Sequence, residues 1–305
     1  MKVLPDWQGE AAAVCVWCGS ALDGDSSRPF GRAICGRCGT GTTDPVPDQA
    51  SLDAAYGDWY WPPAGQRFSL VGDALLRRSR ASMAARIDEV APPGAILDVG
   101  AGEGTLIDAL KERGRKVSGL ERESDHPEIR NMSINEVEGQ FSGVVFWHSL
   151  EHLGNPREAV LEAFRLLIPG GVLVIAVPDN SSFQAAAFGD DWLHLDLPRH
   201  LVHFSGKPLT TGLEESGFRI GPVSGTRAGQ VVIGWLDGLV GTLPGGLDLY
   251  QSLRRKSARR IEITPARRAA AIAAAVILFP VALACAAVEL ACRRSGSVYV
   301  EAHRV

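Results

Sequence analysis

Apolar residues cluster into short runs through the middle of the chain, and stretches of helical periodicity separate these runs. In the stretches 105–113 and 156–168, apolar residues return every three or four positions, as they do along one face of a helix. The runs have the length of buried strands, and they occupy residues 95–99, 116–120, 143–147, 172–177 and 218–223. A further short strand is expected within 130–134. Strands that alternate with helices predict an α/β fold with a parallel sheet, whose ligands bind at the carboxyl ends of the strands.

The first of these strands ends in an acid and three alternate glycines. Asp98 is followed by Gly100, Gly102 and Gly104, and a helical pattern begins directly after them. Glycine accepts positive φ and lets a ligand approach the backbone closely. The second strand ends in Glu121, a position at which nucleotide-binding folds use an acid to hold ribose hydroxyls. From the glycine turn alone, a Rossmann domain for NAD or another nucleotide stays open as an alternative.

The spacing of the acid and the glycines resembles the first motif of the class I, Rossmann-like methyltransferases, which use S-adenosylmethionine (SAM). A second motif follows the fourth strand and resembles the same family: Glu151-His152, a helix, and then Pro169-Gly170-Gly171. The resemblance implies a seven-stranded sheet with an antiparallel last strand, in which the acid after the first strand orients the methionine end of SAM. The residues that it assigns to the cofactor are Asp98, Gly100, Ala101, Gly102, Gly104, Glu121 and His148.

Four of the six cysteines form two C-x-x-C pairs with sixteen residues between them. Two such pairs can turn four thiolates toward one point, which makes a closed tetrahedral zinc site with no open position for water. We therefore expect a structural zinc ion bound by Cys15, Cys18, Cys35 and Cys38. A reduced thiol cluster without metal is the alternative, but it would leave this glycine-rich segment almost without a core. Together with the segment 192–205, the pattern resembles bacterial methyltransferases that carry an N-terminal zinc ribbon.

Composition narrows the partners and the compartment. The formal net charge of −4 gives no indication of nucleic-acid binding. Paired cysteines at metal-site spacing fit a reducing compartment better than a disulfide framework does. The first residues show no apolar stretch of the signal-peptide type. We therefore expect a cytoplasmic protein whose partner is a small molecule and not a nucleic acid.

Residues 269–288 form a run of twenty residues without charge, which is just long enough to cross a bilayer. Arginines that include Arg254 and Arg255 precede this run, and basic clusters attract anionic head groups. The tail 297–305 alternates like a strand. If it is the antiparallel last strand, both ends of the preceding insertion return to the cofactor edge of the sheet.

Two interpretations of this insertion stay open. The first is a membrane-dipping hairpin that presents a lipid-linked or hydrophobic substrate at the inner face of the cell membrane. The second is an alanine-rich helical pair that packs on the sheet or in a dimer interface. The sequence leaves the oligomeric state open.

These features divide the chain into five parts. They are a zinc ribbon (1–44), a linker and leading helix (45–90), a SAM-binding methyltransferase core (91–231), a hydrophobic helical insertion (232–296) and the last core strand (297–305). Within the linker, Tyr56, Trp59, Tyr60 and Trp61 form an aromatic cluster. We expect this cluster to pack the ribbon onto the core.

Histidines near the cofactor edge are the candidates for the chemistry. Methyl transfer from a sulfonium is an in-line displacement that often needs a base for the nucleophile, and histidine titrates near neutral pH. His148 follows the fourth strand, whereas His200 and His203 lie in the segment after the fifth. All three are therefore candidate catalytic residues, and His148 is also a candidate contact of the cofactor.

Three interpretations of this chemistry stay open. The first is O-methylation of a sugar, a glycolipid or a lipid-linked acceptor. The second is metal-assisted transfer, because His148, Glu151 and His152 share one helical face and could bind a divalent cation with His200 or His203. The third is a non-catalytic SAM-fold scaffold that uses the ribbon to dock a partner. Glu151 and His152 can also be a helix-start pair with a purely structural role.

Overall fold

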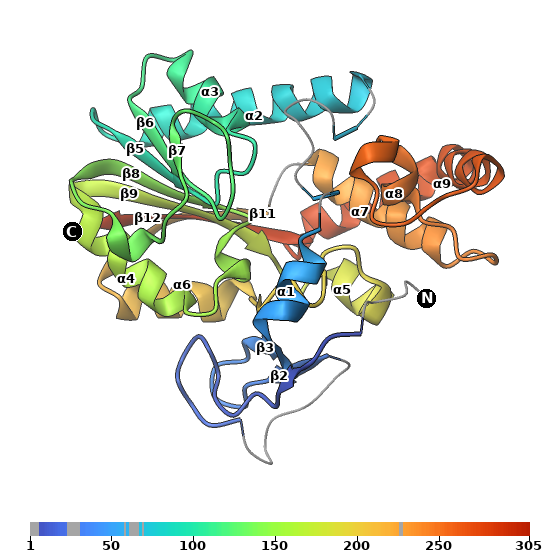
Figure 1. Ribbon diagram of the computed structural model, residues 1–305, viewed down its shortest axis with the longest axis horizontal. Helices are drawn as coiled ribbons and strands as arrows, with labels where there is room; N and C mark the ends of the chain where they lie inside the picture. The colour runs from blue at the N-terminus through green and yellow to red at the C-terminus, as the bar shows by residue number, and fades with distance from the viewer. Residues whose placement is uncertain (1–5, 23–30, 58, 61–66, 69, 226–227) are drawn as a thin grey trace.

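A seven-stranded sheet lies at the centre of the molecule, in the order β11-β12-β9-β8-β5-β6-β7 (Figure 1). Its strands are β5 (Ile96–Val99), β6 (Val117–Leu120), β7 (Ile129–Arg130), β8 (Phe141–Trp147), β9 (Leu167–Pro178), β11 (Phe218–Gly225) and β12 (Ser297–Arg304). The strands from β9 to β7 pair in parallel, whereas β12 is antiparallel to both of its neighbours. This order confirms the α/β fold and the antiparallel last strand. The structure is a computed structural model, and it describes residues 6–22, 31–57, 59–60, 67–68, 70–225 and 228–305.

The third strand of the chain order is shorter than the sequence predicts. β7 is a two-residue strand, residues 131–133 belong to no strand, and the 3-10 helix η1 (Ile134–Glu136) begins at the last residue of the predicted range. Ser133 accepts from the backbone of η1, and its own N–H donates to the Glu136 carboxylate at 2.8 Å. This capping box directs the chain into a helical turn and ends the strand early.

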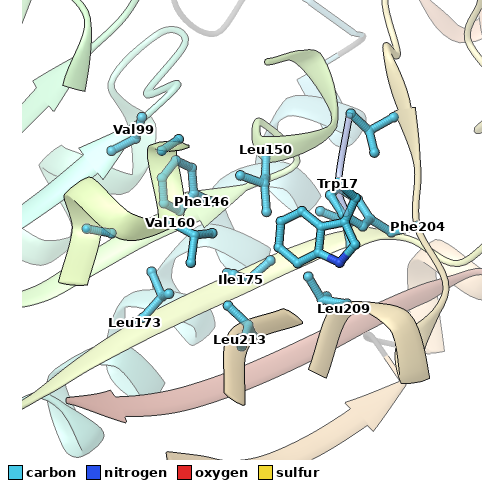
Figure 2. Packing of buried hydrophobic residues seen from close by; sticks show 14 of the residues in the cluster. Trp17, Val99, Phe146, Leu150, Val160, Leu173, Ile175, Phe204, Leu209 and Leu213 are labelled. Atoms are coloured by element: carbon cyan, nitrogen blue, oxygen red, sulfur yellow. The ribbon is translucent and has the colours of Figure 1, made fainter. Parts of the chain in front are cut away.

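Alternate residues of the central strands face two separate cores. Val145 and Trp147 of β8 belong to the core under α2 and α3, whereas Val144 and Phe146 belong to the core under α4 and α6 (Figures 1 and 2). The strands are therefore buried on both faces, as their unbroken apolar runs predict. The covering helices are α2 (Leu70–Val90), α3 (Thr105–Lys111), α4 (Pro156–Leu166) and α6 (Gly206–Glu215).

The ribbon shares a core and a sheet with the rest of the chain. Its strands β2 (Arg32–Ile34) and β3 (Gly41–Thr43) form a three-stranded sheet with β10 (Val202–His203), in the order β10-β3-β2. Trp17 is only 2% exposed. It meets Phe204 edge-on at 5.1 Å between ring centroids and donates from Nε1 to the Pro208 carbonyl at 3.0 Å (Figure 2). The remaining N-terminal elements are β1 (Gly9–Glu10), β4 (Val46–Pro47) and α1 (Gln49–Ala55).

The insertion before the last strand is helical, as predicted. Its elements are α7 (Ala228–Gly241), α8 (Leu249–Leu253), the 3-10 helix η4 (Lys256–Ala258) and α9 (Pro265–Ala291). Leu236 and Val240 of α7 share a small apolar core with Ala271 and Ala282 of α9. Near the end of α9, the buried Glu289 carboxylate accepts from Trp235 Nε1 at 2.7 Å and from the side-chain amide of Gln184 in α5 at 2.8 Å. The insertion is therefore anchored to the core at its C-terminal end.

The opposite side of α9 is apolar and exposed. Val276 is 71% exposed and Ile277 is 76% exposed. Within the described residues, α9 is the one helix whose length and composition would allow it to cross a membrane. Figure 1 shows the helix at the margin of the molecule, beside α7 and α8. Other short elements of the chain are α5 (Phe183–Phe188), η2 (Leu150–His152) and η3 (Gly189–Asp191).

One of the arginines that precede α9 is buried and not available to lipid head groups, contrary to the expectation from sequence. Arg254 is 2% exposed and donates to the Trp59 carbonyl at 3.2 Å. Arg255 forms an ion pair with the buried Asp73 at 3.0 Å. These contacts join the insertion to the linker and to α2. The Arg254 guanidinium acts inside the protein, whereas the Arg255 side chain is 35% exposed.

Candidate cofactor and catalytic site

The turn after β5 is shaped by its glycines. Gly100, Gly102 and Gly104 have φ angles of 79°, 57° and 76°, which residues with a side chain rarely adopt. The N–H groups of Gly100 and Ala101 donate to the Leu120 carbonyl at 2.8 and 3.0 Å. These two bonds tie the turn to the end of β6.

A side chain at each glycine would meet different surroundings. A Cβ at Gly100 would lie 2.3 Å from the Cβ of Ser149, and one at Gly104 would lie 2.5 Å from the ring of His126. A Cβ at Gly102 would meet nothing within 4 Å. The first and third glycines are therefore required by the packing of the protein itself, whereas Gly102 borders open space. A ligand can approach the backbone at this position.

Glu121 holds a carboxylate beside this space. Its Oε2 accepts from the N–H of Gly102 at 2.8 Å, and its Oε1 accepts from the N–H of Arg122 at 2.8 Å. Each carboxylate oxygen can accept more than one hydrogen bond. The position and the chemistry of Glu121 therefore fit the two hydroxyl groups of the SAM ribose.

Asp98 lies under the turn and is buried. Burial raises its pKa to about 7, while Arg80 opposes the rise and the Glu121 carboxylate adds to it. The ionised form of Asp98 is therefore poorly compensated by the protein. A cation beside it would offset the cost of ionisation, and SAM carries both an ammonium and a sulfonium. The residues of the turn and the two acids thus fit SAM.

His148 follows β8 in an uncommon conformation. Its φ is 53°, which costs free energy for a residue with a side chain and is frequent at active sites. Its Nδ1 lies 3.4 Å from Glu151 Oε1. Its Nε2 is buried and has no hydrogen-bond partner among the described residues. The imidazole therefore has one nitrogen toward a carboxylate and the other nitrogen unpaired.

Glu151 connects two of the histidines. It is 1% exposed, and its Oε1 also lies 4.0 Å from His200 Nε2. Burial opposes ionisation of Glu151, but His148, His200 and His152 bring its pKa below the ordinary value. In the part of the chain that the structure describes, neither carboxylate oxygen accepts a hydrogen bond. Glu151 is therefore a buried, ionised group whose compensation comes from imidazoles.

His200 and His152 are held by the segment after β9. His200 Nδ1 lies 3.0 Å from the His194 carbonyl, and burial lowers the pKa of His200 to about 4, with His152 adding to this effect. His152 Nδ1 lies 3.0 Å from both the hydroxyl of Tyr56 and the carbonyl of Arg199. His200 is therefore neutral near pH 7, and it is suited to position a substrate or to bind a metal.

His203 has a different environment from the other candidates. It lies in β10, opposite Gly41 of the ribbon, and its Nε2 is 3.0 Å from the hydroxyl of Thr43. Burial lowers its pKa well below the ordinary value, and His200 and Arg32 add to the effect. The structure thus brings His148, Glu151 and His200 together and places His203 against the ribbon. Its catalytic role stays a prediction.

Arg199 lies beside the histidine cluster, although no sequence motif identifies it as a functional residue. The guanidinium of Arg199 lies 4.8 Å from the ring of Trp59 and 4.7 Å from that of Tyr60, and it pairs with Asp196 at 2.5 Å. The aromatic cluster of the linker therefore packs on the segment that carries the candidate residue His200, and its predicted contact with the ribbon stays a prediction. Trp61 lies outside the described residues. In the sequence, the aromatic cluster is the feature from which a buried cation could have been predicted.

The four ribbon cysteines form a compact thiol cluster. Cys15 Sγ lies 3.7 Å from Cys38 Sγ, and Cys18 Sγ lies 3.7 Å from Cys35 Sγ. All four sulfurs lie within 4.8 Å of one another. Zinc–sulfur bonds of about 2.3 Å in a tetrahedron require sulfurs roughly 3.8 Å apart. The sulfur positions therefore fit a tetrahedral metal ion.

A second set of possible metal ligands lies at the histidine cluster. Ligand atoms of Glu151, His152 and His200 lie within 4.8 Å of one another. Glu151, His152 and His200 all belong to the set that the sequence predicts, but His148 is not among the converging ligands. His148 precedes η2, which is a short 3-10 helix, so it does not share a helical face with Glu151 and His152 as it would on an α-helix.

A model of the methyltransferase domain matches residues 66–222 of the chain, which is about half of its length. The chain belongs to the class I SAM-dependent methyltransferases. The match covers the glycine turn, Glu121 and the histidine cluster, and it begins after the ribbon and ends before the insertion. The cofactor of this methyltransferase family is SAM.

Relatives of known description are distant. A ubiquinone biosynthesis O-methyltransferase of Maricaulis maris (strain MCS10) is 28% identical over an alignment of 149 residues that covers 41% of this chain and 59% of that protein. A protein of the same description from Xanthomonas axonopodis pv. citri (strain 306) is 26% identical over an alignment of 204 residues that covers 58% of this chain and 83% of that protein. The methyltransferase thus spans about three fifths of the Maricaulis relative.

Solved structures whose backbones align with this chain are also distant in sequence. A putative sarcosine dimethylglycine methyltransferase from Galdieria sulphuraria aligns with a TM-score of 0.47 and 12% identity, over 83% of this chain and 98% of that one. A possible histamine N-methyltransferase from Thermotoga maritima aligns with a TM-score of 0.44 and 14% identity, over 76% of this chain and 92% of that one.

Proposed function

We propose that this protein transfers the methyl group of SAM to an oxygen atom of a small acceptor, such as a sugar, a glycolipid or a lipid-linked molecule. The observation that carries the proposal is the His148–Glu151 pair at the end of β8. His148 Nδ1 lies 3.4 Å from the carboxylate, while Nε2 is buried without a partner in the described part of the chain. The O-methyltransferase description of the distant relatives agrees with it.

The pair suits proton removal from a hydroxyl group. SAM supplies an electrophilic methyl group when it is bound. The Glu151 carboxylate favours a proton on Nδ1 of His148, which leaves Nε2 with a lone pair. That lone pair can accept the hydroxyl proton as the oxygen attacks, and Glu151 then stabilises the imidazolium. His200 is neutral near pH 7 and can hold the acceptor by a hydrogen bond.

We propose that Asp98, Gly100, Ala101, Gly102, Gly104 and Glu121 hold SAM. The open space at Gly102, the carboxylate of Glu121 beside it and the uncompensated burial of Asp98 support this set. His148 follows the adjacent strand, so it stays in the set as a contact of both cofactor and acceptor.

We propose a structural zinc ion at the four ribbon cysteines, because their sulfurs fit a tetrahedron. Four thiolates leave no coordination position for water, so the ion stabilises the fold and takes no part in the transfer. Its stabilising effect extends to β10, since β3 of the ribbon pairs with that strand.

We propose that the exposed side of α9 rests on the cytoplasmic face of a membrane, where it would bring the enzyme to an apolar acceptor. The support is the exposure of apolar residues such as Val276, Ile277 and Phe279 along one helix. Both ends of the insertion remain attached to the core, and this favours a helix that lies on the membrane surface over one that crosses it.

Metal-assisted transfer is the second candidate. It is favoured by one observation, the convergence of Glu151, His152 and His200 within 4.8 Å. In that mechanism the carboxylate and the imidazoles would hold a divalent cation that lowers the pKa of the acceptor hydroxyl. Full activity in the presence of a chelator that leaves the ribbon intact would exclude it.

The proposal can be tested before the acceptor is identified. Purified protein is incubated with SAM carrying an isotopically labelled methyl group and a small-molecule and lipid extract of the source cells. We expect labelled ethers or esters with the wild-type protein and none with His148→Gln, although this variant still binds SAM. Label on nitrogen or carbon, or equal labelling by the His148→Gln variant, would contradict the proposed O-transfer with His148 as base.

A further inference from the structure

A cavity of about 230 Å³ lies between the ribbon, the segment after β9 and the residues that follow α9. Its lining combines polar and apolar residues. The lining residues are Arg32, Ile34, Asn180, Ser181, Ser182, Ala185, Ala186 and Arg294. The volume is below the range of about 300–1,000 Å³ that holds drug-sized ligands, so the cavity suits one small group of a larger molecule.

The guanidinium of Arg32 is incompletely paired. Its side chain is 10% exposed. One terminal nitrogen donates to the Asn180 side chain at 2.8 Å, and the other lies 3.7 Å from the half-exposed Asp190. Its Nε is buried and has no partner in the described ranges of the chain. A buried cation with an unused donor is costly unless an anion completes its hydrogen bonds.

A second guanidinium is fixed at the same cavity. Arg294 donates from Nε and Nη2 to the Ser181 carbonyl at 3.1 and 2.6 Å, and its planar group lies 4.7 Å from the ring centroid of Phe183. These contacts hold the side chain in place, and in the described part of the chain its guanidinium forms no ion pair within 4.0 Å, although it attracts the nearby Asp179 carboxylate electrostatically. The two arginines therefore reach one cavity from opposite ends of the chain.

The cavity adjoins the segment that carries the catalytic candidates. Arg32 lies opposite Thr43 in the ribbon sheet, and directly opposed residues of antiparallel strands point to the same face. Thr43 Oγ1 donates to the His200 carbonyl at 2.5 Å and lies 3.0 Å from His203 Nε2. The N–H of Asn180 donates to the Phe204 carbonyl at 2.7 Å. The cavity is therefore built on the same loop as the active site.

We propose that this cavity binds a phosphate-type oxyanion carried by the methyl acceptor. Two guanidinium groups and the side-chain amide of Asn180 are hydrogen-bond donors of the kind that such a group requires. Helix α9, with its exposed apolar side, ends three residues before Arg294. A phosphorylated soluble acceptor and a lipid phosphate share this chemistry, and the cavity can serve either. The proposal rests on the proposed function and adds the charge class of its acceptor.

Inorganic pyrophosphate is the probe for this site. It is titrated calorimetrically, at low ionic strength, into the wild-type protein, Arg32→Gln and Arg294→Gln. Arg293→Gln is the matched control, because this neighbouring arginine does not line the cavity. We expect at least about tenfold weaker binding in the first two variants and unchanged binding in the control. Arg294 is exposed, so its variant reports on the site even if Arg32→Gln unfolds. Equal pyrophosphate affinity in wild type, Arg294→Gln and Arg293→Gln would overturn the proposal.

The source of the phosphate group is found with vesicles. Protein is sedimented with vesicles of phosphatidylcholine and with vesicles that also contain phosphatidic acid. Sedimentation that depends on both phosphatidic acid and Arg294 supports the site with a lipid phosphate as ligand. Pyrophosphate binding that needs Arg294, with no such dependence in vesicles, supports it with a soluble phosphate. Absence of both effects in a protein that binds SAM overturns the site and leaves the methyltransferase proposal standing, whereas absence of SAM binding defeats the proposed function itself.

Discussion

The N-terminal ribbon and the α7–α9 insertion are both additions to the seven-stranded sheet, yet they bury their apolar side chains to very different extents. Trp17 of the ribbon is 2% exposed and belongs to the core under α4 and α6, whereas Ile277 of α9 is 76% exposed. Apolar surface that is buried stabilises the fold, and apolar surface left in contact with water costs free energy unless a partner covers it.

This difference assigns the two additions different roles. The ribbon supplies strand β3 to the sheet that contains β10. It therefore stabilises the segment after β9, which carries the candidate catalytic residues. The insertion is anchored through Glu289, Arg254 and Arg255, and its outer side is available to a partner. We expect changes in the ribbon to alter stability, and changes on the outer side of α9 to alter binding alone.

The largest effect is expected from loss of a ribbon cysteine. Cys18→Ser removes one of four proposed zinc ligands, and structural zinc sites contribute many kcal/mol to folding. We expect the free energy of unfolding to fall by more than about 3 kcal/mol and the bound zinc to be lost, as measured by thermal unfolding and metal analysis. Cys292→Ser, at the exposed end of α9, is the control and should change neither quantity. Equal stability of the two variants would show that the ribbon carries no structural ion.

Truncation of a single side chain in each region compares their packing directly. Trp17→Ala should cost about 3–5 kcal/mol, because it leaves a large cavity in a shared core. Ile277→Ala should change the free energy of unfolding by less than about 0.5 kcal/mol, since the side chain is exposed. Urea unfolding measures both. A cost of similar size in the two variants would mean that the outer side of α9 is buried in solution, for example by a second copy of the chain.

The two regions should respond to acid in opposite directions. The pKa of His200 is lowered to about 4, so between its ordinary value and pH 4 the unfolded chain binds a proton that the native loop does not. Stability on the ribbon side therefore falls as pH drops from 7 to 5, by about 2 kcal/mol at pH 5. Burial raises the pKa of Glu289, so at this residue the native insertion binds a proton more readily than the unfolded chain. The native state at the Glu289 anchor is therefore stabilised as the pH falls.

Hydrogen exchange at pH 7 and pH 5, corrected for intrinsic rates, tests this opposition. We expect β3 and β10 to lose protection at pH 5 while α7 and α9 keep theirs. His200→Asn should reduce the loss in β10 in part, because it removes one of the two histidines of lowered pKa there and leaves His203. Earlier loss of protection in α9 than in β10 would be inconsistent with the assigned anchors.

The smallest effect on stability is expected on the outer side of α9. The double variant Val276→Ser and Ile277→Ser should lower the free energy of unfolding by no more than about 1 kcal/mol, through helix propensity, and should reduce flotation with lipid vesicles severalfold. Leu161→Ser, at an exposed leucine of α4, is the matched control and should float like wild type. Undiminished flotation of the double variant would remove α9 from the membrane contact.

Sequence reasoning succeeds here where the pattern is local. The glycine turn at Gly100–Gly104 and the two C-x-x-C pairs are short motifs whose geometry follows from adjacent residues, so both are recognisable without a structure. The pairing of Thr43 with the segment at His200 and the stacking of Arg199 on Tyr60 join residues more than 130 positions apart. Such contacts depend on the whole fold, and no local spacing encodes them.

The same limit explains the wrong expectation for Arg254 and the ion pair of Arg255 that the sequence does not predict. In sequence both are basic residues before an apolar run, and this pattern is typical of membrane flanks. In the structure the linker brings the Trp59 carbonyl to Arg254, and α2 brings Asp73 to Arg255. The partners lie about 180 or more positions earlier in the chain. The sequence therefore shows the charge of the arginines but not the groups that they contact.

Titration of SAM into two glycine variants is the most direct test of the central claim, that SAM binds at the Gly102 turn. Gly102 and Gly114 both have positive φ, 57° and 82°, and a Cβ at either would meet nothing within 4 Å. Valine should therefore strain the backbone similarly at both positions, but only Gly102 borders the proposed cofactor space. We expect Gly114→Val to bind SAM like wild type and folded Gly102→Val to show no measurable binding. SAM affinity in folded Gly102→Val equal to that of Gly114→Val would contradict the account.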